Sequence, residues 1–134
     1  MNTKKIRLTA AQLSFSVGAI QENKSKIIDT LEQSEKIQSD IVIFPELSIT
    51  GYPPEDLLLR ESFIGKNFAV LEEIAEYSGS SSAIVGFVDR SLNEDSTDNY
   101  DRKISNAAAI VQNGDVKGIY HKCFLPNYSV FDEA

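Results

Sequence analysis

The apolar residues of the chain recur at two spacings, one typical of strands and the other typical of helices. Residues 6–13 alternate well enough between apolar and polar positions to predict a first strand. Residues 20–38 place apolar side chains on one helical stripe and lysines and glutamates on the remainder, which predicts an amphipathic helix. The stripe consists of Ile20, Ile27, Ile28 and Leu31. The apolar run Ile41–Phe44 then predicts a buried strand, so strand, helix and strand follow one another as in a crossover unit.

The middle of the chain predicts a second helix and a third strand. Residues 62–77 repeat apolar side chains at spacings of three and four, which predicts a helix with one buried face. That face consists of Ile64, Phe68, Leu71 and Ala75. Residues 83–88 predict a strand, and residues 89–103 predict an exposed loop because they are polar and acidic and show no periodicity.

A β-hairpin is predicted near the end of the chain. Residues 105–112 and 116–120 both favour strands, and Asn113-Gly114 between them readily takes the positive φ angles of a hairpin turn. This hairpin would deliver Lys122 at its exit. With the crossover unit, it predicts an α/β domain in which helices and sheet form layers.

Composition and charge narrow the class of protein. The chain has 134 residues, of which 42% are hydrophobic and 25% charged, as in an ordinary globular domain. Because 20 acidic residues outnumber 13 basic ones, the net charge of -7 opposes binding to nucleic acid or to anionic membranes. Small molecules or proteins are therefore the expected partners.

The sequence shows no sign of membrane insertion or export. It contains no apolar run near the roughly 20 residues that cross a bilayer, and its first residues lack a signal-like apolar core. A cytoplasmic location is therefore expected. The single cysteine cannot form an intramolecular disulfide, which is compatible with a reducing compartment.

Glu46 and Lys122 are the candidates for chemistry. Glu46 follows the predicted buried strand, at the end where α/β sheets usually place their ligand sites, and could accept a proton from a nucleophile. Lys122 precedes an aromatic-rich loop and could stabilise an oxyanion. Amide or nitrile hydrolysis would use both groups. Taken singly, each also fits a structural role: Glu46 as a solvated residue or helix cap, and Lys122 as a surface ion-pair lysine.

Four stretches of the sequence together resemble a known family. They are Phe44–Leu47 (FPEL), Thr50–Leu58 (TGYPPEDLL), Leu125–Tyr128 (LPNY) after Lys122, and Phe131–Glu133 (FDE). In these motifs the chain resembles the nitrilase superfamily, also called the carbon-nitrogen hydrolases. Within that superfamily it is most similar to the N-terminal glutaminase domains of glutamine-dependent NAD synthetases.

The resemblance implies a fold and a set of site residues. It implies a nitrilase-type αββα sandwich and a Glu-Lys-Cys triad, in which Glu46 and Lys122 would be the first two members. It also implies that Tyr128 and Phe131 wall a glutamine pocket. Two further residues are expected to contribute to substrate binding, Tyr52 because it lies near Glu46, and Glu133 as a match to an additional family carboxylate.

The chain departs from the family where the nucleophile should appear. In the family the cysteine lies on an elbow beyond the FDE segment, whereas this sequence ends at Ala134. Residues 1–134 are therefore expected to form the N-terminal part of the glutaminase domain, truncated after the lysine loop. The nucleophile segment and the synthetase domain would be absent, and the core would be open on one side.

For an intact protein the resemblance implies glutamine-dependent NAD synthesis. Hydrolysis of the glutamine amide would supply ammonia for the ATP-dependent amidation of deamido-NAD. ATP and Mg²⁺ are expected in the absent synthetase domain, and none of the described motifs implies a metal site in this segment. The partners would be glutamine and the synthetase domain of the same chain, within a homo-oligomer.

Three alternatives remain open on the sequence. Cys123 could be a nucleophile paired with His121, since residues two apart in an extended segment share a face, but a packing cysteine and a structural histidine are favoured. The protein could instead be another nitrilase-type amidohydrolase, such as an ω-amidase or a carbamoyl-amide hydrolase. It could also be a noncatalytic folding or assembly module.

Overall fold

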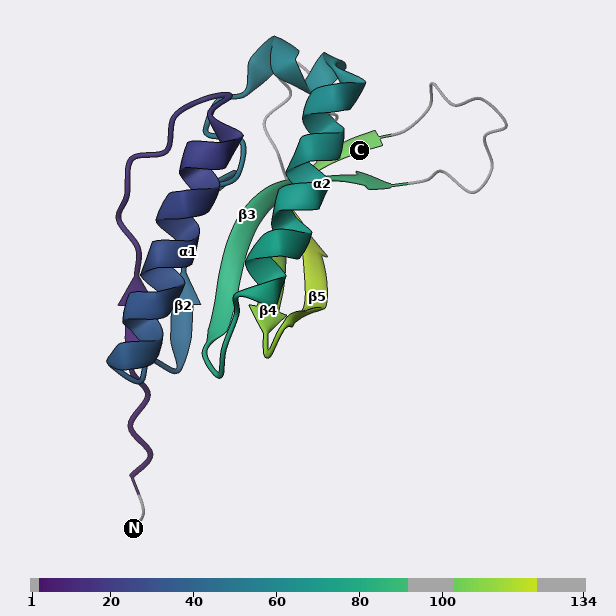
Figure 1. The fold of residues 1–134 in the computed structure, drawn as a ribbon. Helices are drawn as coiled ribbons and strands as arrows, with labels where there is room; N and C mark the ends of the chain where they lie inside the picture. Colours follow the sequence, from purple (N-terminus) through teal and green to yellow (C-terminus); the bar gives the residue numbers. More distant parts are fainter. Residues whose placement is uncertain (1–2, 92–102, 123–134) are drawn as a thin grey trace.

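The five strands lie side by side in the order of the sequence, and both α-helices cover one face of the sheet (Figure 1). The computed structural model describes residues 3–91 and 103–122. In chain order its elements are β1 (Leu8–Ala10), α1 (Ile20–Lys36), β2 (Ile41–Ile43), the 3-10 helix η1 (Glu55–Leu59), α2 (Glu61–Glu76), β3 (Ser82–Ser91), β4 (Lys103–Gln112) and β5 (Asp115–His121).

The direction of the strands determines which ends meet. β1, β2 and β3 pair in parallel, as the predicted crossover unit requires, whereas β4 is antiparallel to both β3 and β5. Two successive reversals leave β5 running in the same direction as β2 and β3. The carboxyl ends of β2 and β5 therefore lie at the same edge of the sheet, next to the amino end of β4.

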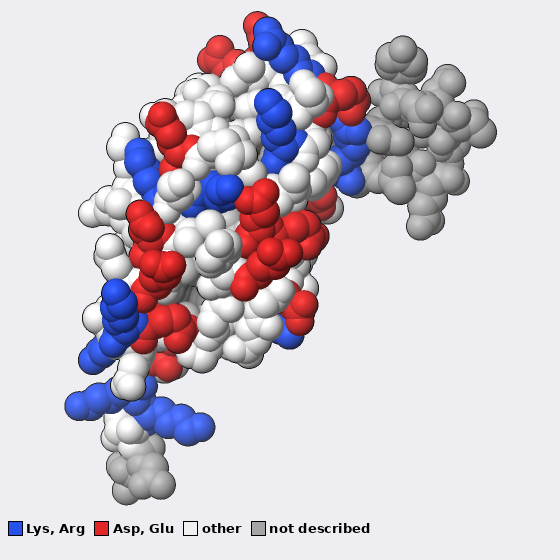
Figure 2. Space-filling model, in the orientation of Figure 1, with Lys and Arg blue, Asp and Glu red and all other residues white. Residues whose placement is uncertain are grey.

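The core lies between the sheet and the two helices. Fully buried side chains from α1, α2 and the strands meet there, among them Ile27, Ile74, Val42, Val85 and Phe87. On the outer surface of the helices, acidic and basic side chains are interspersed (Figure 2), and Lys24 Nζ lies 2.7 Å from Glu73 Oε2. This ion pair joins α1 to α2. No helix among the described residues is long and apolar enough to cross a membrane.

The opposite face of the sheet exposes apolar side chains. Leu8, Ile43, Ile110 and Tyr120 are between 38% and 64% exposed. They alternate along their strands with the residues that face the helices, and the strand register places them on one surface. The apolar face that the sequence predicted to be open is thus present in the described part of the chain.

The predicted elements are confirmed, with differences at their ends. β1 contains only three of the eight residues 6–13, and both α-helices lie within about a residue or two of their predicted bounds. In α2, Phe68 is only partly buried, because the buried face is rotated toward Phe63 and Asn67 and leaves Phe68 at its edge. Its buried side chains are Phe63, Ile64, Asn67, Val70, Leu71, Ile74 and Ala75.

The prediction of a loop over residues 89–103 is wrong at both of its ends. Asp89, Arg90 and Ser91 continue β3, and Lys103 begins β4. Polar residues have low strand propensity, but here antiparallel pairing satisfies their backbone, and Asp89 and Arg90 find charged or polar partners. Arg90 Nη2 lies 2.9 Å from Glu61 Oε2 at the start of α2. Residues 92–102 lie outside the described part of the chain.

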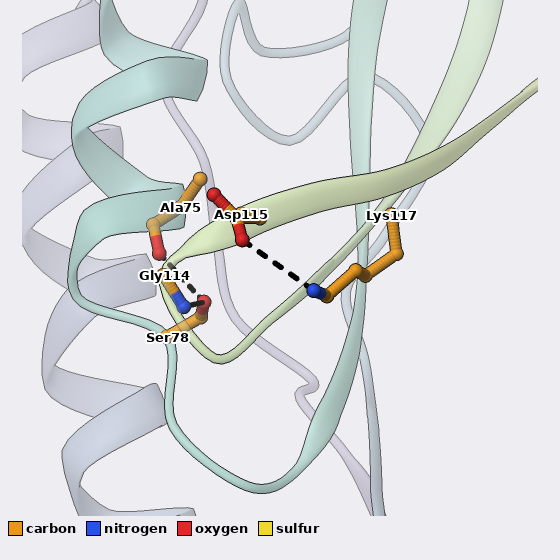
Figure 3. A network of polar contacts seen from close by, with 5 residues as sticks. All are labelled: Ala75, Ser78, Gly114, Asp115 and Lys117. Atoms are coloured by element: carbon orange, nitrogen blue, oxygen red, sulfur yellow. Dashed lines mark hydrogen bonds and ion pairs between the residues drawn. The ribbon is translucent and has the colours of Figure 1, made fainter.

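The predicted hairpin is confirmed, and its turn is attached to α2. Asn113 and Gly114 have φ angles of 50° and 85°. The N–H of Gly114 donates to Ser78 Oγ (3.0 Å), and that hydroxyl donates to the carbonyl of Ala75 (2.6 Å) at the end of α2 (Figure 3). These two bonds fix the position of β5 relative to the helix layer.

A close backbone approach positions the segment after β2. β3 continues beyond the end of β2, where Gly86 bonds to the segment that follows β2. The Gly86 N–H donates to Ser48 Oγ at 3.2 Å, and the Ile49 N–H donates to the Gly86 carbonyl at 3.1 Å. A Cβ at Gly86 would lie 2.6 Å from the Pro45 carbonyl oxygen and closer still to the Leu47 nitrogen. Only glycine permits this contact.

We therefore expect Gly86→Ala to destabilise the protein. The added methyl group must displace backbone rather than a flexible side chain, so the free energy of unfolding should fall by about 1–3 kcal/mol in urea denaturation. Gly118→Ala on β5 is the control, because its Cβ would meet nothing within 4 Å. Equal stability of the two variants would contradict the close approach.

Glu35, near the end of α1, accepts hydrogen bonds from the loop before β3. The Ser81 N–H donates to Oε1 at 2.9 Å, and the Ser80 hydroxyl donates to Oε2 at 3.1 Å. The backbone bond from Ser81 lowers the pKa of Glu35 below its usual 4.5, with help from the two serine hydroxyls and against a smaller effect of burial. Because the folded-state pKa is the lower one, the ionised carboxylate stabilises the fold above the unfolded-state pKa, and this contribution is lost as the pH falls through the folded-state pKa.

Glu35→Gln should therefore destabilise the protein at pH 7, by less than about 1 kcal/mol because the carboxylate is partly exposed. The difference from the wild type should shrink as the pH is lowered below about 4. Thermal unfolding across this pH range measures it, with Glu32→Gln on the exposed side of α1 as the control. A difference that does not change with pH would rule out this role for the ionised carboxylate.

Candidate active site

Glu46 and Lys122 meet at the edge of the sheet, although 76 positions separate them in the sequence. Lys122 Nζ lies 2.8 Å from Glu46 Oε1, and each side chain is 43% exposed. Both groups are therefore held in hydrogen-bonding geometry while they remain accessible to a ligand. The pair follows from topology, because β2 and β5 both end at this edge.

The segment that carries Glu46 leaves β2 in a constrained conformation. The Phe44 N–H still donates to the Ile84 carbonyl of β3 at 3.0 Å, after which Pro45 offers no N–H for pairing. Leu47 is fully buried and has a φ of 50°, a left-handed conformation that is unusual for a residue other than glycine. Backbone held on both sides in this way fixes the direction in which Glu46 points.

Lys122 is aligned by the last backbone hydrogen bond between β4 and β5. Its N–H donates to the Asn106 carbonyl at 2.9 Å. The side-chain amide of Asn106 donates a hydrogen bond to Glu46 Oε1. Asn106 therefore contacts both members of the pair, one through its backbone and the other through its side chain.

The sequence analysis missed Asn106. It lies in β4 just before three alanines, and it is only 4% exposed. A buried side-chain amide needs hydrogen-bond partners, and here Glu46 supplies one. The signal in the sequence was a polar residue inside an apolar strand, which by itself does not reveal the partner.

A cavity of about 270 Å³ opens beside the ion pair. It has an apolar floor formed by the sheet, with the Glu46 carboxylate, the Lys122 ammonium group and the Asn106 amide at its polar end. Its lining residues are Phe44, Pro45, Glu46, Ile84, Gly86, Asn106, Ala107, Ala108, Tyr120 and Lys122. Tyr120, at the rim, and Gly86, in the floor, were not among the predicted site residues.

The chemistry available here is proton transfer combined with charge stabilisation. A carboxylate within reach of a nucleophile can accept its proton, and an ammonium group beside it can stabilise an anionic oxygen. The described lining contains no cysteine, serine or threonine that could attack a carbonyl. Across residues 3–91 and 103–122, no three His, Cys, Asp or Glu side chains gather closely enough to hold a metal ion.

Tyr52 is a predicted site residue that lies within the described part of the chain but does not line the cavity. It is half exposed and precedes a cis peptide bond to Pro53. Its role in substrate binding stays a prediction. The substrate-binding roles of Tyr128, Phe131 and Glu133 also stay predictions, because these residues lie outside the described part of the chain. Cys123, considered as a nucleophile but favoured as a packing residue, lies outside it as well.

His121 contacts a carboxylate on the neighbouring part of the sheet. Its Nε2 atom lies 2.6 Å from Asp89 Oδ2, so the ring contacts the end of β3. This contact fits the structural role that the sequence favoured for His121. It also strengthens the position of β5 immediately before Lys122.

Known proteins are similar in sequence to this chain over almost its whole length. The chain is 40% identical over 132 residues to a glutamine-dependent NAD(+) synthetase of Thermotoga maritima, and 43% identical over 129 residues to that of Aquifex aeolicus. These alignments cover 97% and 96% of this chain but only 21% of each relative. The chain thus spans about a fifth of the length of the curated relatives that it matches.

Solved structures agree with the fold. The crystal structure of a glutamine-dependent NAD(+) synthetase from Cytophaga hutchinsonii has a TM-score of 0.82 and 27% identity, over 96% of this chain and 22% of that protein. An amidase of the nitrilase superfamily from Nesterenkonia has a TM-score of 0.77 at 19% identity, over 96% of this chain and 48% of the amidase, which supports the fold alone.

The family follows from the extent of these matches. Residues 7–133 match the carbon-nitrogen hydrolase family. The mixed sheet, the helices on one of its faces and the open second face represent part of the nitrilase-type fold. This chain belongs to the carbon-nitrogen hydrolase family.

Proposed function

We propose that this chain is the N-terminal part of the glutaminase domain of a glutamine-dependent NAD synthetase. The contact between Glu46 Oε1 and Lys122 Nζ beside a cavity carries the proposal, because it joins a proton acceptor and a cation. The choice of glutamine rests on the synthetases that share 40% and 43% identity with this chain.

Glu46 is the general base in the proposed reaction. It accepts the proton of a thiol, and the resulting thiolate attacks the carbon of the glutamine side-chain amide. When the carbon–nitrogen bond breaks, Glu46 returns that proton to the leaving nitrogen, which departs as ammonia. The acyl group remains on the sulfur as a thioester, and water then hydrolyses it to glutamate.

Lys122 stabilises the anionic oxygen that forms during both steps. Its ammonium group is anchored to the carboxylate at 2.8 Å, so it is already oriented when negative charge develops on the substrate. Preorganisation of this kind lowers the barrier because no side chain has to reorganise during the reaction. The apolar floor of the cavity favours the same interactions by limiting water around them.

The thiol is proposed to come from a cysteine beyond residue 134 in a longer protein. The described lining of the cavity offers no nucleophile, and the chain matches only a fifth of its relatives. A mutant of the Nesterenkonia amidase carries the acetamide moiety of fluoroacetamide covalently at its active site cysteine. That observation supports cysteine as the attacking residue on this fold.

The remaining parts of the proposal concern the whole protein. The ammonia would amidate deamido-NAD in an ATP-dependent step on the synthetase domain, where ATP and Mg²⁺ are expected to bind. Tyr128, Phe131, Glu133 and Tyr52 are proposed to contact glutamine. The acidic net charge of -7 is compatible with small-molecule substrates.

In the full-length protein, Glu46→Gln and Lys122→Ala should each lower glutamine-dependent NAD synthesis by at least about 100-fold. Each substitution removes one group that acts on the amide, whereas free ammonia bypasses the amide altogether. Synthesis from ammonium chloride should therefore continue near the wild-type rate. Both activities are measured as NAD formed from deamido-NAD and ATP.

Matched changes on the helical surface serve as controls. Glu73→Gln and Lys24→Ala break an ion pair of similar length, 2.7 Å, on the helical surface, and both activities should be preserved. If the Glu46 and Lys122 variants both kept glutamine-dependent synthesis, the proposed function would be wrong. If neither the wild type nor any variant released ammonia from glutamine, a panel of other amides would identify a different amidohydrolase.

A further inference from the structure

We infer that Asn106 is a positioning residue for the proton acceptor, an inference that rests on the proposed function. Its buried side-chain amide donates to Glu46 Oε1, and its backbone carbonyl accepts the Lys122 N–H at 2.9 Å. No other residue among those described is bonded both to the Glu46 carboxylate and to Lys122. Asn106 therefore fixes the two groups relative to each other at the polar end of the cavity.

The two donors converge on the same carboxylate oxygen. Lys122 Nζ lies 2.8 Å from Oε1, and the Asn106 amide nitrogen also donates to Oε1. A carboxylate oxygen has about two lone-pair sites, so these two donors fill both sites on Oε1. The thiol proton is therefore assigned to the second oxygen, Oε2, which accepts no hydrogen bond from the described residues.

The position of Asn106 makes this arrangement rigid. It lies in β4, between β3 and β5, where it pairs with Val88 of β3, and it is only 4% exposed. Glu46 itself is on a loop, and its side chain is 43% exposed. A long exposed carboxylate would otherwise sample several rotamers, so the amide restricts Glu46 to the one that faces Lys122.

The test compares Asn106→Leu with Asn106→Asp in the full-length protein. Leucine has a similar size but no donor, and aspartate keeps the shape while it replaces the donor with a second carboxylate oxygen. Both keep the backbone carbonyl that accepts the Lys122 N–H. Each should lower kcat for glutamine-dependent NAD synthesis by about 10- to 100-fold, while KM for glutamine changes much less. Ammonia-dependent synthesis should be unchanged.

A double substitution separates a positioning role from a general loss of stability. If Asn106 acts through Glu46, adding Asn106→Leu to Glu46→Gln should cause little further loss of glutamine-dependent synthesis. Asn23→Leu is the matched control, because Asn23 is a fully buried asparagine whose amide donates to the Ser16 and Ile49 carbonyls and not to Glu46. It should lower thermal stability but leave kcat within a few-fold of the wild type.

The positioning role of Asn106 and the proposed glutaminase function can be tested independently. If Glu46→Gln abolishes glutamine-dependent synthesis but both Asn106 variants keep the wild-type kcat, the positioning role is overturned and the function stands. If the wild type shows no glutamine-dependent synthesis, crystal structures of the wild type and Asn106→Leu test whether Asn106 positions Glu46. Loss of the contact between Glu46 Oε1 and Lys122 Nζ, to beyond about 4 Å, supports the positioning role, and its retention overturns it.

Discussion

The site depends on one constraint, which is that β2 and β5 run in the same direction and end at the same edge of the sheet. This direction brings a carboxylate and an ammonium group together across 76 positions of sequence. The close packing of Pro45 and Leu47 on Gly86 then sets the height of Glu46 above the sheet. The hairpin turn, bonded to Ser78, does the same for the strand that carries Lys122. Each side of the ion pair is thus held by backbone.

The cavity lies on the open face of the sheet, so a layer that covered this face would also cover the cavity. Ile84, Ala108 and Tyr120 line the cavity and also lie on the apolar face opposite the helices. A layer that covered this face would bury its apolar side chains and would also exclude water from Glu46 and Lys122. In an αββα sandwich a second sheet provides such a layer, so closure of the core and completion of the site would occur together.

Local patterns predicted the elements and singled out Glu46 and Lys122, but they did not predict how these residues contact one another. Helix periodicity and Asn113-Gly114 have strong local causes, and Glu46 and Lys122 stood out because each follows a strand. Their 2.8 Å contact depends on the pairing of β3 with β4, which no local signal specifies. Asn106 was missed for the same reason, since its partner Glu46 lies on the loop after β2. The polar end of β3 was missed because its side chains find charged partners only in the folded chain.

The central claim is that Glu46 and Lys122 flank the carbon that is attacked during amide hydrolysis. The most direct measurement is a crystal structure of the full-length protein after reaction with a chloroketone analogue of glutamine, which alkylates a reactive thiol. The account predicts a cysteine sulfur bonded to the inhibitor within the cavity, with the inhibitor oxygen about 3 Å from Lys122 Nζ and the sulfur next to Glu46. An adduct on a cysteine elsewhere, with this cavity empty, would contradict it.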